Sequence, residues 1–89
     1  MRIDFTETAW QDYVYWQTQD RKTLKRVNNL IEDITRNGYV GIGNPEPLAG
    51  DLSGWWSRRI DSQHRLVYRL ADASAAVEIS QCRWHYKRK

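Results

Sequence analysis

The sequence predicts a small α+β domain in which a strand, two helices and three further strands follow one another. Apolar residues recur at three- and four-residue intervals through residues 24–34, which is the period of an amphipathic helix. Segments of alternating polarity, separated by short polar turns, occupy residues 55–82, and such turns join antiparallel strands. We therefore expect an antiparallel sheet packed against a helical hairpin. The length of 89 residues predicts one domain spanning residues 1–89.

The first strand and the first helix are predicted from residues 1–19. Residues 1–5 alternate in polarity and are expected to form the strand. Thr6 is an N-cap candidate for a helix that runs to about Gln19, because its hydroxyl oxygen can accept a hydrogen bond from the first turn. Phe5 and Trp10 then occupy the two hydrophobic-staple positions. One face of this helix is predicted to contain Trp10, Tyr13, Val14 and Gln17.

The second helix is expected to begin after Asp20, another N-cap candidate. It should end at Asn37 and Gly38, because glycine readily adopts the left-handed conformation of a C-cap. The very short connection makes the two helices an antiparallel hairpin. The apolar positions of the second helix are Leu24, Val27, Leu30, Ile31 and Ile34.

A long loop and three strands are predicted for the second half. Residues 39–54 contain four glycines and both prolines, which favours an ordered loop without a regular element. The strands are expected at residues 55–60, 64–70 and 75–82. A three-residue turn would place Arg59 opposite Arg65. The core face would then carry Trp56, Ile60, Leu66, Tyr68 and Leu70, and the other face Ser57, Arg59, Arg65, Val67 and Arg69.

Charge and cysteine content limit the classes of function. The net charge is +3, and all of the excess lies in residues 42–89, which contain eight basic and five acidic residues. This asymmetry favours a polyanion as partner, although a solvated basic surface has the same composition. The single cysteine, Cys82, excludes an internal disulfide framework and favours the cytoplasm. No segment has the composition of a signal peptide or a membrane span.

Several residues carry candidate chemistry. Arg59 and Arg65, facing each other on adjacent strands, would repel unless an anion lay between them, which favours phosphate binding. The alternative is that these arginines lie in solvent or pair with nearby aspartates. Glu46 lies between Pro45 and Pro47, which stiffen the backbone that presents its carboxylate. The alternative for Glu46 is an ordinary surface glutamate.

The last residues, Cys82-Arg83-Trp84-His85-Tyr86, combine a histidine with a cation and aromatic rings. A carboxylate, arginines, a histidine and a tyrosine are together the groups of a metal-free ribonuclease. Strict alternation would turn His85 toward the core, so an acid role for it requires a bulge or an earlier end of the strand. Two histidines and one cysteine give no metal-ligand spacing, and we expect no metal or cofactor.

Several motifs, in the same order and at nearly the same spacing, resemble the YoeB toxins of the RelE superfamily over nearly the whole chain. They are Trp10 to Gln17, Asn44-Pro45-Glu46-Pro47-Leu48, Leu52 to Ile60, His64-Arg65-Leu66-Val67-Tyr68 and Cys82 to Tyr86. The resemblance implies a microbial-ribonuclease-like fold and a ribosome-dependent endoribonuclease that cleaves mRNA in the ribosomal A site. It also implies a YefM-type antitoxin, a homodimer, and operator DNA binding only through the antitoxin complex.

The resemblance also implies roles for individual residues. Glu46 would be the general base, Arg65 the phosphate clamp, His85 the general acid and Tyr86 the ring that orients the substrate. Arg59 would assist in phosphate binding. Further candidate RNA contacts are Arg58, Arg83, Trp84 and the basic patch of Lys22, Lys25 and Arg26 on the second helix. This chain departs from the family pattern at Gln63, at Trp84 and in the basic tail at residues 87–89.

Two other classes of function remain open from the sequence. A non-catalytic module could block translation by occupying the ribosome or RNA. Alternatively, the chain could act mainly as a structural partner of a DNA-binding antitoxin, since it shows no recognition helix of its own.

Overall fold

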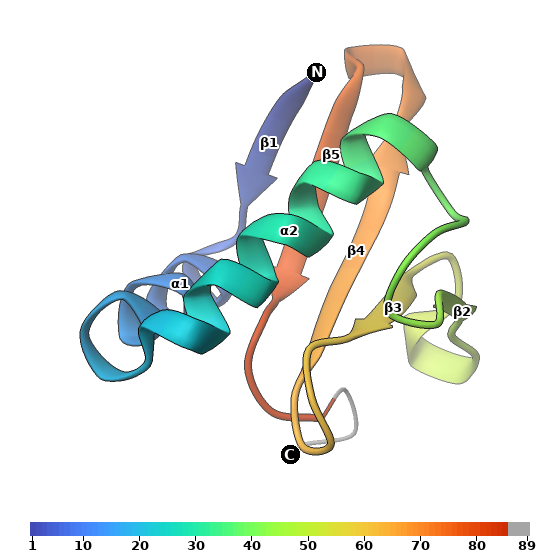
Figure 1. The fold of residues 1–89 in the computed structure, drawn as a ribbon. Helices are drawn as coiled ribbons and strands as arrows, with labels where there is room; N and C mark the ends of the chain where they lie inside the picture. The colour runs from blue at the N-terminus through green and yellow to red at the C-terminus, as the bar shows by residue number, and fades with distance from the viewer. Residues whose placement is uncertain (86–89) are drawn as a thin grey trace.

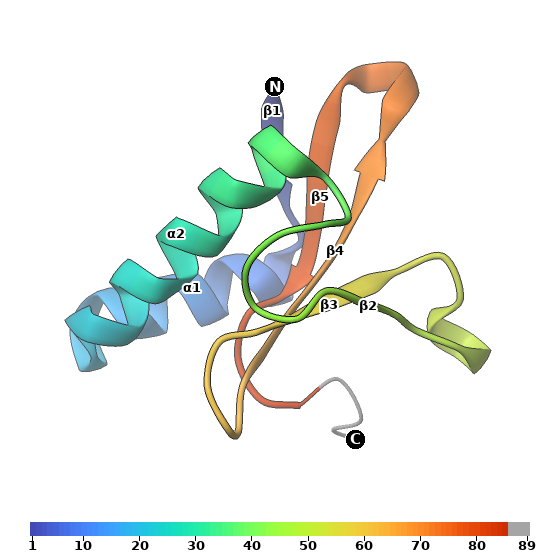
Figure 2. The ribbon, with the colours of Figure 1, turned by 45° about the vertical axis from the view of Figure 1, so that its right-hand side comes forward.

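The computed structural model describes residues 1–85, and the elements follow the predicted order (Figure 1). The helices and strands are β1 (Arg2–Phe5), α1 (Glu7–Gln19), α2 (Arg21–Asn37), β2 (Glu46–Pro47), β3 (Trp56–Arg59), β4 (Arg65–Ala71) and β5 (Ala76–Gln81). Short 3-10 turns occupy Gly50–Leu52 and Asp72–Ser74. The five strands form one sheet in the order β1-β5-β4-β3-β2. Both helices lie on one side of this twisted sheet (Figure 2).

The predicted helix ends are confirmed by their capping bonds. The Thr6 side chain accepts a hydrogen bond from the backbone N–H of Ala9 at 3.0 Å, and Asp20 accepts one from Thr23 at 3.1 Å. Each bond satisfies a donor of the first helical turn that has no partner within the helix. Gly38 ends α2 at a φ of 68°. These local signals fix the lengths of both helices.

The face of α1 that carries Trp10, Tyr13, Val14 and Gln17 is not its most deeply buried face. The buried residues of the helix are Ala9, Asp12 and Trp16, whereas Trp10 and Val14 are 51% and 38% exposed. The ring of Trp10 packs beside Phe5 with 5.8 Å between centroids, as the staple positions predict. This contact holds Trp10 at the end of β1. Asp12 and Trp16, on another side of α1, contact Cys82 just after the end of β5.

The sheet is mixed, which corrects the prediction of an antiparallel sheet. The pairs β3–β4 and β4–β5 are antiparallel as expected, and Arg59 lies opposite Arg65. However, β1 pairs in parallel with β5. In addition, the predicted loop contains β2, which pairs with β3. The β1–β5 pairing joins segments distant in sequence, which local alternation does not encode, and β2 is only two residues long and contains Pro47, so it has no alternating pattern of its own.

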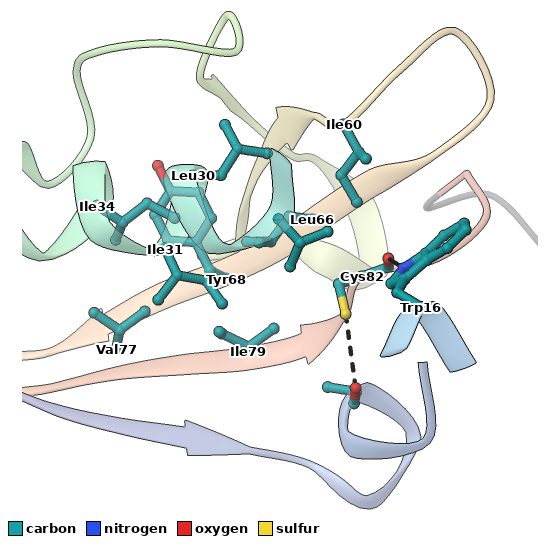
Figure 3. Packing of buried hydrophobic residues seen from close by; sticks show 12 residues of the cluster. Trp16, Leu30, Ile31, Ile34, Ile60, Leu66, Tyr68, Val77, Ile79 and Cys82 are labelled. Atoms are coloured by element: carbon teal, nitrogen blue, oxygen red, sulfur yellow. Dashed lines mark hydrogen bonds between the residues drawn. The ribbon is translucent and has the colours of Figure 1, made fainter. Parts of the chain in front are cut away.

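The core lies between α2 and the central strands (Figure 3). It contains Val27, Leu30, Ile31 and Ile34 from α2 and Leu66, Tyr68, Val77 and Ile79 from β4 and β5. Leu24 packs at the edge of this cluster. The apolar positions predicted for α2 are therefore those that anchor it to the sheet. Within the described residues, no helix is long and apolar enough to cross a membrane.

Candidate active site

Three predicted site residues share one face of the sheet. Glu46 lies opposite Ser57 in the β2–β3 pair, and Arg59 lies opposite Arg65 in the β3–β4 pair. Ser57 and Arg59 are two positions apart on β3, so their side chains and those of their partners point to the same face. The alternate residue Leu66 belongs to the core, so this face is turned away from the helices. A carboxylate and two guanidinium groups are thus carried by three neighbouring strands on an outer face.

The loop before β2 holds Glu46 near Arg59. The carbonyl oxygen of Gly43 accepts a hydrogen bond from the backbone N–H of Arg59 at 2.7 Å. A Cβ atom on Gly43 would lie 2.8 Å from a Leu30 methyl carbon, so a side chain here would force its neighbours to shift, and the φ of Gly43 is 82°. Asn44, at a φ of 53°, donates from its side-chain amide to the Glu46 carboxylate at 3.0 Å. Glu46 itself is exposed, so its carboxylate is accessible to a ligand.

Arg59 and Arg65 carry charge that no acid of residues 1–85 neutralises through an ion pair. Arg65 donates to the backbone carbonyls of Asp61 and His64 at 2.8 and 3.1 Å. The Asp61 carboxylate instead accepts from the backbone N–H groups of Gln63 and His64. An ion pair between Asp61 and these arginines, the alternative prediction, is therefore wrong. The Arg65 guanidinium is oriented by the turn and keeps donors for an anion.

Arg69 does not belong to this group, although alternation places it on the same face. Its guanidinium pairs with Glu78 at 2.6 Å and lies 4.3 Å from the centroid of the Trp55 ring. Of the three arginines that alternation places on this face, Arg59 and Arg65 are thus the two without an ion pair among residues 1–85.

The C-terminal segment runs beside the β3–β4 turn, as both ribbon views show (Figures 1 and 2). β5 ends at Gln81, and Trp84 has a φ of 66°, so the strand ends before His85. The Trp84 carbonyl accepts a hydrogen bond from the backbone N–H of Arg65 at 2.9 Å. His85, which is half-buried, therefore follows directly after a residue bound to Arg65. Tyr86 and the basic tail lie outside the described residues.

The predicted RNA contact through Arg58 is wrong, because Arg58 is completely buried. Alternation places it on the core face with Trp56 and Ile60. Its partners are the Asp33 carboxylate, the Tyr68 hydroxyl and the carbonyls of Gly38, Val40 and Ile42. The hydrogen bond from Arg58 holds the pKa of the Asp33 carboxyl below its usual range, and burial raises the pKa of the Tyr68 hydroxyl. Arg58 thus fixes the residues 38–42 loop to the sheet.

The remaining candidate RNA contacts differ in accessibility. Arg83 lies over the Tyr15 ring at 3.5 Å and is half-buried, while Trp84 is 45% exposed. Lys22 and Lys25 are exposed on α2. Arg26 donates to the backbone carbonyls of residues 59 and 60 at 3.0 and 3.3 Å, so it connects α2 to the end of β3. If Arg26 also binds RNA, as predicted, it must do so with the guanidinium donors that this contact leaves free.

Comparison with known proteins decides the family. The model of the YoeB-like toxins of bacterial type II toxin–antitoxin systems matches residues 5–86. The chain belongs to this family. It is 57% identical to Toxin YoeB of Streptomyces coelicolor over 86 residues, which cover 97% of this chain and 100% of the relative.

Solved structures agree with this assignment to the YoeB-like toxins. A YoeB/ParE toxin from Agrobacterium tumefaciens superposes with a TM-score of 0.93 at 43% identity, covering 97% of this chain and 100% of that chain. YoeB from Staphylococcus aureus, solved as a heterotetrameric YoeB–YefM complex and as a dimer, gives a TM-score of 0.88 at 44% identity in each, and each match covers 97% of this chain and 98% of that chain. The predicted RelE-type α+β fold is confirmed.

Sequence reasoning missed three residues of this YoeB-like toxin that hold the C-terminal segment. Asp12, Trp16 and His64 are all nearly buried, and each hydrogen-bonds the backbone of residue 82 or 84. The only local signal was the spacing of Asp12 and Trp16, four residues apart on α1, which places both on one face. Within residues 1–85, no cluster of three or more His, Cys, Asp or Glu side chains could hold a metal ion.

Proposed function

We propose that this YoeB-like toxin is a ribosome-dependent endoribonuclease that cleaves mRNA in the ribosomal A site and so stops translation. The main support is the outer sheet face that carries Glu46, Arg59 and Arg65, together with the bond between Arg65 and Trp84 that brings the segment leading to His85 to the same edge. A base, an acid and phosphate-binding cations are the groups needed to cleave RNA through its own 2′-hydroxyl.

In the proposed reaction, Glu46 is the general base and removes the proton of the ribose 2′-hydroxyl, whose oxygen attacks the adjacent phosphorus. Arg65, assisted by Arg59, stabilises the charge that develops on the non-bridging oxygens. His85 donates a proton to the 5′-oxygen as its bond to phosphorus breaks, and Tyr86 orients the substrate by stacking. The products are a 5′-hydroxyl and a 2′,3′-cyclic phosphate, which water can open to a 3′-phosphate.

We also propose a YefM-type antitoxin as protein partner and a homodimeric free state. The support is that S. aureus YoeB is found both in a YoeB–YefM complex and as a dimer. Operator DNA would be bound only by the complex with the antitoxin. Because the proposed substrate is mRNA on the translating ribosome, the proposed site of action is the cytoplasm.

The proposal predicts that Glu46→Gln and His85→Ala each slow mRNA cleavage on purified ribosomes by about 10²- to 10⁴-fold, the usual contribution of a general acid or base. Mapping of 5′ ends measures the cuts, and circular dichroism checks the fold. Glu32→Gln is the matched control, because Glu32 is an exposed glutamate on α2 away from the sheet face. Full activity of a folded Glu46→Gln, His85→Ala double variant would refute the site assignment.

The same experiment separates the enzyme from a non-catalytic inhibitor. A protein that only occupies the ribosome would stop translation without producing discrete new 5′-hydroxyl ends. Wild-type inhibition with uncut mRNA would therefore overturn the proposed activity and leave the RNA- or ribosome-binding alternative.

A further inference from the structure

The backbone of the C-terminal segment is held by side chains from distant elements. Cys82 donates its backbone N–H to the Asp12 carboxylate at 3.1 Å, and its carbonyl accepts from the indole N–H of Trp16 at 2.8 Å. Figure 3 shows the Trp16 bond at the point where β5 ends. Asp12 and Trp16 thereby fix both backbone groups of one residue. This clamp sets the position from which the segment leaves the sheet.

A second clamp lies two residues further on and depends on His64. The Trp84 backbone N–H donates to His64 Nδ1 at 2.7 Å, while the Trp84 carbonyl accepts from the Arg65 backbone N–H at 2.9 Å. The His64 ring is 9% exposed and packs edge-on against Trp16 at 4.9 Å. A histidine that accepts at Nδ1 carries its proton on Nε2. The ring is therefore both a spacer and a hydrogen-bond acceptor.

Trp84 requires such a restraint because of its backbone. Its φ of 66° lies in the left-handed region, which is unfavourable for a bulky residue and persists where surrounding contacts hold it. The two backbone bonds to His64 and Arg65 supply these contacts. The left-handed residue redirects the chain directly before His85.

We propose that His64 is a positioning residue for the reaction, which acts by holding Trp84 so that His85 is directed to the phosphate beside Arg65. This inference rests on the proposed function of His85 as the general acid. His64 itself is not proposed to contact RNA. The hydrogen bond that Nδ1 accepts from Trp84 contributes more to this positioning than the size of the His64 ring.

Two substitutions separate the acceptor from the ring. His64→Phe keeps an aromatic ring but removes the acceptor, whereas His64→Asn can place an amide oxygen close to the position of Nδ1. In single-turnover cleavage at saturating ribosomes, we expect His64→Phe to be about ten- to a hundredfold slower, the scale of a small misplacement of a catalytic group. His64→Asn should retain most of the wild-type rate. The ribosome concentration that gives half the maximal rate should be the same for both variants as for the wild type. Equal rates for the two variants would overturn the inference.

A modified mRNA tests whether the loss passes through His85. With a 5′-bridging sulfur at the scissile phosphate, the leaving thiolate needs no proton, so an acid-defective enzyme recovers. His64→Phe and His85→Ala should both approach the wild-type rate on this substrate. If His64→Phe stayed slow on both linkages, its role would not be the positioning of His85. If the wild type failed to cut ordinary mRNA, the proposed function itself would fail.

Amide hydrogen exchange gives a direct measurement on the folded wild type. The Trp84 amide should be protected in the wild type and in His64→Asn and should exchange rapidly in His64→Phe. The ¹⁵N shift of His64 Nδ1 should be that of an unprotonated acceptor nitrogen. A Trp84 amide that exchanges at the solvent rate in the wild type would contradict the inference, even if His64→Phe did not fold.

Discussion

At the scale of single residues, Arg58 shows that a charged side chain can belong to the core. Its guanidinium has no exposed surface and is surrounded by one carboxylate, one hydroxyl and three carbonyl oxygens. Removal of the cation would leave several buried acceptors without a donor, which is among the most destabilising kinds of polar mutation. The neighbouring Arg59 is exposed, so two adjacent arginines have opposite roles.

We therefore expect Arg58→Met to lower the free energy of unfolding by about 3 kcal/mol, since breaking a buried ion pair costs about 3 to 5 kcal/mol. Arg59→Met is the matched control and should change it by about 0.5 kcal/mol or less, as exposed substitutions do. Urea denaturation followed by tryptophan fluorescence measures both. Equal stability of the two variants would show that the buried network contributes little.

At the scale of elements, the loop that carries Glu46 depends on the close approach of its backbone to the core. Gly43 has a φ of 82°, and a Cβ there would lie 2.8 Å from a Leu30 methyl carbon and 3.3 Å from the Arg59 carbonyl. Gly50 also has a positive φ, 63°, but a Cβ there would meet nothing within 4 Å. The two glycines therefore differ mainly in how much space surrounds the position of a Cβ atom.

Replacing each glycine by alanine separates backbone strain from displacement of the loop. Gly50→Ala should lower the free energy of unfolding by about 1 kcal/mol through strain alone, and Gly43→Ala by about 2 to 3 kcal/mol because overpacking adds to strain. Only Gly43→Ala should also slow mRNA cleavage, since it displaces Glu46 relative to Arg59. Thermal unfolding and single-turnover cleavage provide the two readouts. A Gly43→Ala variant with wild-type cleavage would indicate that the loop can shift without moving the carboxylate.

The elements also show which parts of the fold and site could be predicted from sequence. The caps at Thr6 and Asp20 are local, so both helices were predicted closely. The parallel pairing of β1 with β5 involves distant segments, and the two-residue β2 has no alternating pattern, so neither was predicted. At the site, strand alternation paired Arg59 with Arg65, whereas Glu46 was joined to them only through the resemblance to the YoeB toxins.

Arg58 and Arg59 were both predicted to contact RNA because of their charge. Strand alternation, given more weight, would have placed Arg58 on the core face and Arg59 on the outer face. Both clamps, that of Asp12 and Trp16 on residue 82 and that of His64 on residue 84, were hidden, because they join residues that lie far apart along the chain. Such interactions carry no local pattern.

At the scale of the whole molecule, the beginning of α2 lies next to the end of β3, at the edge of the outer sheet face. Arg26 on α2 donates to the carbonyls of residues 59 and 60, so the first turns of α2 lie beside the end of β3. Lys22 and Lys25, exposed on these turns, are therefore near the edge of the proposed active site. Arg2 and Arg36 lie elsewhere, since Arg2 is in β1, at the sheet edge opposite β2, and Arg36 is in the last turn of α2.

This arrangement predicts a surface that contributes to ribosome binding and not to the chemical step. The double variant Lys22→Gln, Lys25→Gln should bind ribosomes more weakly, and the slope of log affinity against log salt should fall by up to about two, because each lysine can neutralise one phosphate. Cleavage at saturating ribosomes should be unchanged, because neither lysine lies on the sheet face of Glu46 and Arg65. The control, Arg2→Gln with Arg36→Gln, removes the same charge away from that edge and should leave the slope unchanged. If both double variants reduced affinity equally, net charge alone, and not the position of the lysines, would control binding.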